Sequence, residues 1–215
     1  MDGPVASGKT AVGLRIAREL GYRLVDTGMM YRALTWLALQ RRVSVTDEEA
    51  LTKLADEAEI ELGQPTQDGR MRIRIDSSDV TSELRSPGVD RNVSYVSMLP
   101  GVREAMVRRQ RELAAEGNLV MLGRDIGSVV LPDAPVKIYL DASALERAKR
   151  RHREMEEGGL ERPLADVLRE LEQRDQMDRE RHASPLKPAE DAIVIDTDDL
   201  TLEEVTQRVL AAAGA

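Results

Sequence analysis

The sequence predicts an α/β fold whose core is a parallel sheet between layers of helices, with a small β-containing insert. Two observations predict the core: short apolar strands alternate with helices along the chain, and a glycine-rich segment at 3–8 directly precedes a helix. Alternating strands and helices form right-handed βαβ units, so the sheet should be doubly wound. The insert is predicted from 60–82, where Met71, Ile73 and Ile75 alternate with arginines and glycine supplies a turn in "QDGR".

Apolar periodicity and end signals define the elements of the first half of the chain. Asp47 is placed to cap a polar helix, and a proline stands near the first turn of each of two later helices. The expected elements are a helix at 11–20, a strand at 22–26, helices at 29–40 and 47–58, the antiparallel β insert at 60–82, and helices at 86–99 and 100–117.

The second half of the chain continues the alternation. Its first two strands are short, apolar and rich in branched residues, as is typical of buried parallel sheets. Two charged helices follow, and a last strand precedes the final helix. The expected elements are strands at 118–127 and 134–142, helices at 143–158 and 164–182, a strand at 191–197 and a helix at 201–213.

Composition is typical of a globular protein of a reducing compartment. Of 215 residues, 41% are hydrophobic and 33% are charged, and there is no cysteine, which excludes disulfides and thiolate metal sites. The net charge of −8 argues against binding the backbone of DNA or RNA. No apolar run approaches the length that spans a bilayer, and no signal segment opens the chain. We therefore expect a cytoplasmic protein without membrane or nucleic-acid partners.

The opening segment "MDGPVASGKT" has the spacing of a phosphate-binding loop that leads into a helix. Glycine at 3 and 8 lets backbone N–H groups approach phosphate oxygens, and the helix N-terminus adds donors. Lys9 would reach the β- and γ-phosphates, and the Thr10 hydroxyl would ligate Mg²⁺. The residues expected to surround the nucleotide phosphates are Gly3, Pro4, Val5, Ala6, Ser7, Gly8, Lys9, Thr10 and Ala11.

A phosphate loop alone indicates a nucleotide and is shared by GTPases, motors and small kinases. The Asn-Lys-x-Asp signature of guanine binding does not occur in the sequence, which argues against a GTPase. The motif "DTGMMYR" stands at the end of the expected strand 22–26, where open α/β sheets bind ligands. This second motif narrows the class of nucleotide-binding protein.

Four segments, in this order and spacing, resemble the bacterial cytidylate kinase family: "DGPVASGKT", "LVDTGMMYRAL", "LGRDIGSVVLPDAPVKIYLDAS" and "RDQMDRERHASPL". The resemblance extends from residue 2 to about residue 205. It implies a three-layer P-loop kinase core with a parallel sheet, a small β-containing NMP-binding insert and a helical lid. The implied division is a core at 1–29, 116–145 and 186–215, an NMP-binding region at 30–115 with its β insert near 60–82, and a lid at 146–185.

The resemblance also implies an activity: direct phosphoryl transfer from ATP to CMP or dCMP, giving CDP or dCDP, with Mg²⁺ as cofactor, in a monomer. Residues 3–11 would bind ATP, Arg32 and Arg124 would hold the acceptor phosphate, and Asp178 would meet the ribose hydroxyls. The implied catalytic residues are Lys9, Arg124, Arg174 and Arg181. The implied CMP-binding residues are Asp26, Thr27, Arg32, Ser94, Arg103, Arg124, Asp125, Asp178 and Arg181.

The chemistry of cytosine agrees with three of these residues. Its ring presents an amine donor beside two acceptors, so Asp125 and Ser94 suit the amine and the Arg103 guanidinium suits the acceptors. Uracil would set acceptor against acceptor and donor against donor, which supports discrimination. The acceptor phosphate is already an anion and needs no general base, and His152 and His182 are accordingly predicted to lie on the surface.

Two departures from the family pattern bear on catalysis. Ala11 stands where a second hydroxyl residue is common, so one phosphate contact is lost while Thr10 remains. Met177 stands where the lid pattern has its middle arginine, which weakens the positive cluster around the transferring phosphoryl group. Two alternatives stay open: a related small P-loop kinase acting on UMP/CMP or another acceptor, and a catalytically impaired nucleotide-binding protein.

The start of the chain is unusual for this fold. The phosphate loop normally follows the central strand of the sheet, yet only Met1 and Asp2 precede Gly3. Without that strand, we expect both of its neighbours to be unpaired, which would cost a large share of the stability of the fold. We therefore expect the natural start to lie upstream, with Met1 at the position of the strand's last apolar residue.

Overall fold

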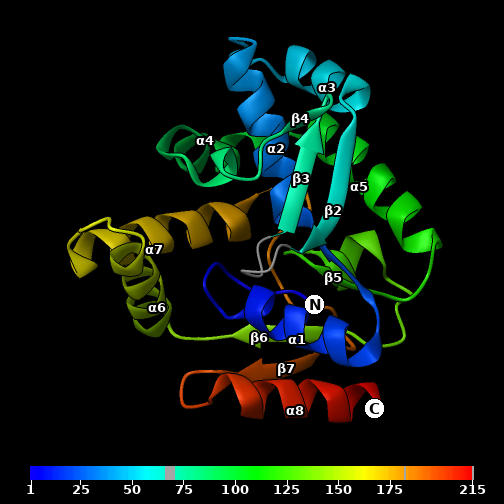
Figure 1. Ribbon diagram of the computed structural model, residues 1–215, viewed down its shortest axis with the longest axis vertical. Helices are drawn as coiled ribbons and strands as arrows, with labels where there is room; N and C mark the ends of the chain where they lie inside the picture. Colours follow the sequence, from blue (N-terminus) through cyan, green and yellow to red (C-terminus); the bar gives the residue numbers. More distant parts are fainter. Residues whose placement is uncertain (66–70, 182, 215) are drawn as a thin grey trace. The chain divides into compact units, whose positions relative to one another are not determined.

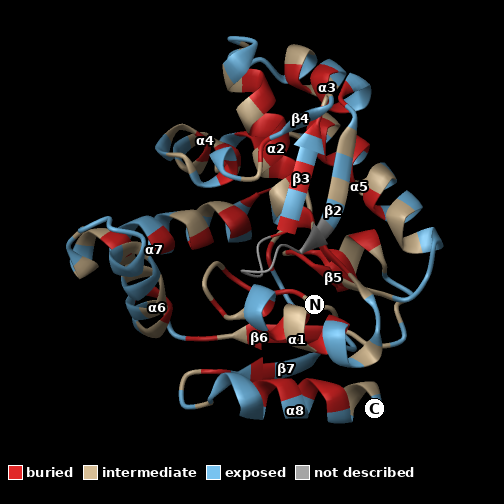
Figure 2. Cartoon of the chain, in the orientation of Figure 1, coloured by how far each residue is buried: buried red, intermediate tan, exposed pale blue. Residues whose placement is uncertain are grey.

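The computed structural model describes residues 1–65, 71–181 and 183–214 (Figure 1). The chain divides into two compact units. The first combines Met1–Leu24 with Asn118–Ala215, and the second is Val25–Gly117. Each unit has buried apolar residues of its own, which Figure 2 marks in red.

The first unit alternates strands with helices, as the sequence predicts. Between the strands at 119–122 and 138–141, the chain forms a short π-helix, η2 (Ile126–Val130). A further strand, β1 (Arg23–Asp26), begins in this unit and ends in the second. The remaining elements are α1 (Lys9–Leu20), β5 (Leu119–Leu122), β6 (Ile138–Asp141), α6 (Ala144–Glu157), α7 (Leu164–Glu180), β7 (Ile193–Asp196) and α8 (Leu202–Ala213).

Met1 links the beginning of the chain to the β5 side of the sheet. Its amino nitrogen donates to the Met121 carbonyl oxygen at 2.8 Å, and its own carbonyl accepts from the N–H of Gly123 at 3.0 Å. β5 also neighbours β1, where the Arg23 N–H donates to the Asn118 carbonyl oxygen at 2.9 Å. The segment before the phosphate loop therefore takes a strand position beside β5.

Asp2 completes the link on the β6 side. It forms a parallel bridge with Tyr139, donates its N–H to the Ile138 carbonyl at 2.8 Å and accepts from the Leu140 N–H at 2.9 Å. β7 then pairs in parallel with β6. Two residues thus bridge β5 and β6, and the expectation that these neighbours would be left unpaired is wrong at this level of the sheet.

Two helices cover the strands of the first unit. α1 and α8 pack on each other, and their apolar faces meet side chains of β6 and β7 in one buried cluster. α6 and α7 share a smaller cluster, against which Val5 of the phosphate loop packs. The larger cluster is Val12, Ile16, Ile138, Leu140, Ile195, Val205, Val209 and Leu210, and the smaller is Ala148, Val167 and Leu171.

The second unit contains the predicted antiparallel β insert. Its strands run in the order β2-β3-β4, and both pairings are antiparallel, which confirms the prediction. The turn expected in "QDGR" lies outside the described residues. The elements are α2 (Thr27–Gln40), α3 (Glu48–Glu57), β2 (Ile60–Pro65), β3 (Met71–Ile75), β4 (Ser78–Asp79), the 3₁₀ turn η1 (Glu83–Arg85), α4 (Pro87–Met98) and α5 (Pro100–Ala115).

The sequence of β3 explains why this small sheet has one buried face. Met71, Ile73 and Ile75 are buried, whereas Arg72 and Arg74 between them are exposed. Successive side chains of a strand point to opposite faces, so the apolar residues face the helices and the arginines face solvent. The insert is therefore held by the core that it shares with α2 and its neighbours.

Side-chain caps determine where two helices of the second unit begin. Asp47 Oδ1 accepts from the Ala50 N–H at 3.0 Å and caps α3, as predicted. Asp26 Oδ1 accepts from the Gly28 N–H at 3.0 Å, so α2 begins at Thr27 rather than at the expected residue 29.

The prediction of a strand over 118–127 is wrong beyond Leu122, where β5 ends. After β5 the chain turns into η2, and the N–H groups of Ile126 and Gly127 donate to the Asp2 carboxylate instead of to a neighbouring strand. Among the described residues, no helix is long and apolar enough to span a bilayer.

Candidate active site

The phosphate loop owes its path to three residues with positive φ: Gly3 at 145°, Ala6 at 60° and Gly8 at 93°. A Cβ added at Gly3 would lie 2.1 Å from the Leu140 carbonyl oxygen, so glycine is required where the loop passes the backbone of β6. Gly8 lies directly before α1. The loop therefore leads straight into a helix N-terminus, whose N–H groups and macrodipole attract anions.

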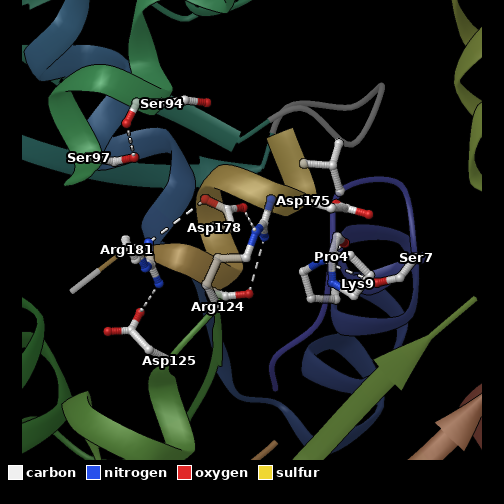
Figure 3. Close-up of polar contacts among 12 residues, drawn as sticks. Pro4, Ser7, Lys9, Ser94, Ser97, Arg124, Asp125, Asp175, Asp178 and Arg181 are labelled. Carbon is white, nitrogen blue, oxygen red and sulfur yellow. Dashed lines mark hydrogen bonds and ion pairs between the residues drawn. The ribbon is translucent and has the colours of Figure 1, made fainter. Parts of the chain in front are cut away.

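The Lys9 side chain lies against the loop (Figure 3). It is 8% exposed, and Nζ donates to the Pro4 carbonyl at 2.6 Å and to Ser7 Oγ at 3.2 Å. Thr10 is exposed on the first turn of α1. The loop thus combines an ammonium group, a helix N-terminus and a hydroxyl oxygen, which are the groups that bind a polyphosphate and its metal ion.

A second group of site residues comes from the segment after β5 and from the end of α7 (Figure 3). Arg124 Nε donates to Asp178 Oδ2 at 3.0 Å. Arg181 lies 3.9 Å from Asp178 Oδ1 and 3.7 Å from Asp125 Oδ1. Asp125, Asp178 and Arg181 are buried. We term these four residues, together with Arg174, the arginine–aspartate cluster.

Electrostatics keep the buried carboxyl group of Asp178 charged. Burial favours its neutral form and alone would raise its pKa, but the neighbouring Arg124, Arg174 and Arg181 outweigh burial and hold the pKa below its usual range. Three guanidinium groups of the cluster face two carboxylates, so the cluster carries an excess of positive charge. Such a cluster suits an anionic ligand that also offers hydroxyl donors to a carboxylate.

The second unit holds the other expected substrate residues. Arg103 is 3% exposed and donates to the Ser97 carbonyl at 3.1 Å. Ser97 Oγ in turn donates to the Ser94 carbonyl at 3.1 Å, as Figure 3 shows. The Arg103 guanidinium also lies 5.7 Å from the centre of the Tyr31 ring. Tyr31 belongs to "DTGMMYR", but the sequence analysis did not single it out.

Arg32, expected to bind the acceptor phosphate, is half-buried in this unit. It donates to the Leu84 carbonyl at 2.7 Å and to Asp90 Oδ1 at 2.6 Å. Asp26 and Thr27 lie at the start of α2, where Asp26 acts as the cap and Thr27 is buried. The expected residues of the second unit thus lie at the end of β1 and on α2, α4 and α5.

A buried ion pair that the sequence analysis missed supports the phosphate loop. Arg147 of α6 is 2% exposed and pairs with Asp175 of α7. It also donates to the carbonyls of Ala142 and Val5, at 3.0 and 3.2 Å. "ERAKRRHRE" is charged along its whole length, and no signal within it distinguishes Arg147 from its more exposed neighbours.

Comparison with known proteins decides the family. The family model described as cytidylate kinase matches residues 1–214 of the chain. The chain belongs to the cytidylate kinase family. This confirms the resemblance inferred from the four sequence segments.

Relatives named cytidylate kinase match along almost the whole chain. That of Geobacillus sp. (strain WCH70) is 50% identical over 98% of this chain and 93% of its own length. That of Desulfitobacterium hafniense (strain Y51) is 46% identical over 98% of this chain and 90% of its own. A crystal structure of an uncharacterized protein from Eubacterium ventriosum ATCC 27560 matches with a TM-score of 0.50 at 14% identity, covering 98% of this chain and 93% of that one. It supports the α/β fold alone.

The departures from the cytidylate kinase pattern lie near the two groups of site residues. Ala11 is exposed beside Thr10, and Met177 is half-buried on α7 between Arg174 and Arg181. His152 lies 3.3 Å from the exposed Glu156 and is partly exposed, whereas His182 lies outside the described residues.

Proposed function

We propose that the chain phosphorylates CMP and dCMP to CDP and dCDP by direct transfer from ATP. The observation that carries this proposal is the arginine–aspartate cluster, which combines buried positive charge with two carboxylates in the unit that holds the phosphate loop. Membership of the cytidylate kinase family supports it. A nucleoside monophosphate needs both features, because it presents a phosphate to the arginines and hydroxyl and amine donors to the carboxylates.

On the donor side, residues 3–11 bind the phosphates of ATP. Lys9 exchanges its contacts within the loop for the β- and γ-phosphates, and the first turn of α1 adds N–H donors. The Thr10 hydroxyl is a hard oxygen ligand and would hold Mg²⁺ at the start of α1. When bound, Mg²⁺ neutralises part of the charge on the donor phosphates.

On the acceptor side, Arg124 and Arg181 hold the phosphate of CMP, and Arg32 is the further arginine that the family resemblance assigns to this phosphate. Arg174 and Asp178 bind the ribose. The acceptor phosphate carries about −1.5 to −2 charges near neutral pH and is itself the nucleophile, so no general base is required. Lys9, Arg124, Arg174 and Arg181 act by balancing charge and by aligning the two phosphates.

Recognition of the base is assigned to Asp125, Ser94 and Arg103. Asp125 and Ser94 accept from the cytosine amine, and Arg103 donates to the ring acceptors. Asp26 and Thr27 complete the CMP-binding set. We further propose that the enzyme is a cytoplasmic monomer, and its net charge of −8 fits a protein that binds small nucleotides rather than nucleic acid.

A steady-state comparison of CMP, dCMP, UMP and AMP with MgATP, in a coupled assay of ADP release, tests the proposal. We expect CMP and dCMP to have kcat/KM values at least about 10²-fold above those of UMP and AMP, because uracil and adenine cannot satisfy the same buried polar groups. A preference for UMP or AMP would indicate a related kinase. Absence of turnover with all four would indicate an impaired nucleotide-binding protein.

A further inference from the structure

Asp2 has an unusual environment for a residue at the edge of a binding loop. It directly precedes Gly3, is 5% exposed, and was not among the expected site residues. Its Oδ1 accepts from the Ile126 N–H at 2.7 Å, and its Oδ2 accepts from the Gly127 N–H at 2.8 Å. Both oxygens of one buried carboxylate are therefore used to hold two consecutive backbone groups, as charge-assisted hydrogen bonds.

The two N–H groups begin η2 and directly follow Arg124 and Asp125 of the arginine–aspartate cluster. A helix start is commonly capped by the side chain of the residue that precedes it. That residue is Asp125, but its side chain does not cap η2 in the described structure, and its carboxylate lies 3.7 Å from the Arg181 guanidinium. Asp2 supplies the cap from elsewhere in the chain, so the Asp125 carboxylate can face the cluster.

The backbone of Asp2 is itself held firmly. It donates to the Ile138 carbonyl at 2.8 Å and accepts from the Leu140 N–H at 2.9 Å, so it lies within the sheet. The preceding carbonyl, of Met1, accepts from the Gly123 N–H at 3.0 Å. The carboxylate thus projects from a backbone held by hydrogen bonds to β6 toward the segment that follows β5, which is the support that a precisely placed binding group requires.

We propose that Asp2 is a positioning residue for the acceptor side of the site. Its carboxylate fixes the backbone at residues 126–127 and thereby the directions of the Arg124 and Asp125 side chains toward CMP. The backbone of Asp2 then fixes the position of the phosphate loop, and its side chain fixes the position of the acceptor-binding segment. This inference rests on the proposed function, in which Arg124 and Asp125 bind CMP.

The variant Asp2→Asn tests the proposal with little change of volume. Its amide nitrogen would face one of the two backbone donors, so one hydrogen bond is lost and that donor is buried unsatisfied. We expect KM for CMP to rise about tenfold while KM for ATP stays within about twofold, since the backbone bonds of Asp2 are kept. The control is Asp47→Asn, which alters an exposed cap of α3 and should change neither KM.

An unchanged KM for CMP in folded Asp2→Asn would overturn the proposal. An equal rise of the KM values for CMP and ATP would also overturn it, because it would indicate a general structural defect instead of an effect on the acceptor side. Amide hydrogen exchange of the ligand-free wild type gives a second readout, which stays decisive if the variant does not fold. The N–H groups of Ile126 and Gly127 should exchange slowly in the wild type, and fast exchange of both would also refute the role of Asp2. If the wild type fails to phosphorylate CMP while these groups are protected, the proposed function is wrong and the Asp2 contact is not.

Discussion

Asp178 is a buried acid that remains ionised because guanidinium groups surround it. Arg124 Nε donates to it at 3.0 Å, and Arg181 approaches from the end of the same helix. Breaking a buried ion pair by removing one partner is costly, because the charge that remains has lost its compensation. The cluster therefore contributes to stability as well as, under the proposed function, to the binding of CMP.

Replacement of this carboxylate should destabilise the protein in a pH-dependent way. At neutral pH, Asp178→Asn should lower the free energy of unfolding by roughly 3 kcal/mol. Because the folded-state pKa lies below the unfolded value of about 3.9, the stabilisation is fully present above that value and is lost as pH falls through the folded pKa. Urea denaturation should show the gap between wild type and variant narrowing below about pH 4.

A gap of constant size across this pH range would contradict the assignment of charge to Asp178. The control is Asp56→Asn, which removes an exposed ion pair with Arg108 on the second unit. Exposed ion pairs contribute little, so this variant should unfold almost as the wild type does at every pH.

Lys9 is expected to act in the transition state. Lys9→Ala should lower kcat by about 10²- to 10³-fold, because a charged donor aimed at the transferring phosphoryl group is lost. The coupled ADP-release assay measures this change. Lys53→Ala is the matched control, since Lys53 is an exposed lysine near Glu57 on α3, and it should keep the wild-type rate. A Lys9→Ala enzyme with more than half the wild-type kcat would rule out the proposed role.

Met177 is a position at which a substitution should raise kcat. On α7 it lies three residues after Arg174 and four before Arg181, so a guanidinium there would lie on the helix face of the cluster. Met177→Arg should raise kcat several-fold by adding charge near the transferring group. Met177→Leu controls for packing and should be neutral. An unchanged or lower kcat in Met177→Arg would defeat this idea.

At the scale of elements, Gly3 connects the sheet to the phosphate loop. Gly3→Ala should destabilise the protein by about 2 kcal/mol or more, because a Cβ would lie 2.1 Å from the Leu140 carbonyl and φ is 145°. Gly88→Ala in α4 is the control: its Cβ would meet Leu39 at 3.5 Å, an ordinary contact, and it should be neutral or slightly stabilising. Urea denaturation compares the two. Equal stabilities would contradict the steric argument.

Periodicity predicted the elements whose own residues decide their structure. β3 alternates in sequence and in burial, and Asp47 caps α3 as its position suggested. The end of β5 could not be predicted, because the Asp2 carboxylate, more than a hundred residues away in sequence, takes the N–H groups that would continue the strand. The pairing of Met1 and Asp2 with both neighbouring strands depends on the same kind of distant contact.

For the whole molecule, the proposed function predicts stabilisation by substrate. Ligand at about 100 times its Kd adds about 2.7 kcal/mol to the free energy of unfolding, enough to raise Tm by several degrees in a chain of this size. CMP should raise Tm in this way, whereas UMP at the same concentration should raise it much less. Calorimetry without ATP measures both. Equal shifts would show that the base is not discriminated in binding.

The sequence predicted which residues belong to the candidate site better than it predicted which of their side chains contact one another. Motifs named Lys9, Arg124, Asp125, Asp178 and Arg181, and the structure brings the last four together. The Arg147–Asp175 pair was missed because both residues lie in charged helical segments whose sequence does not show which arginine faces inward. Which side chains meet depends on burial, and a local pattern does not report burial for charged residues.

The Lys9 ammonium donates to two groups of its own loop, the Pro4 carbonyl and the Ser7 hydroxyl. Under the proposed function, Lys9 therefore exchanges its hydrogen bonds to these two loop atoms for contacts with phosphate oxygens when the nucleotide binds. Under this function, the affinity of Lys9 for phosphate is a difference between two sets of contacts, so ADP should be released more easily than from a lysine that makes no contacts within the loop.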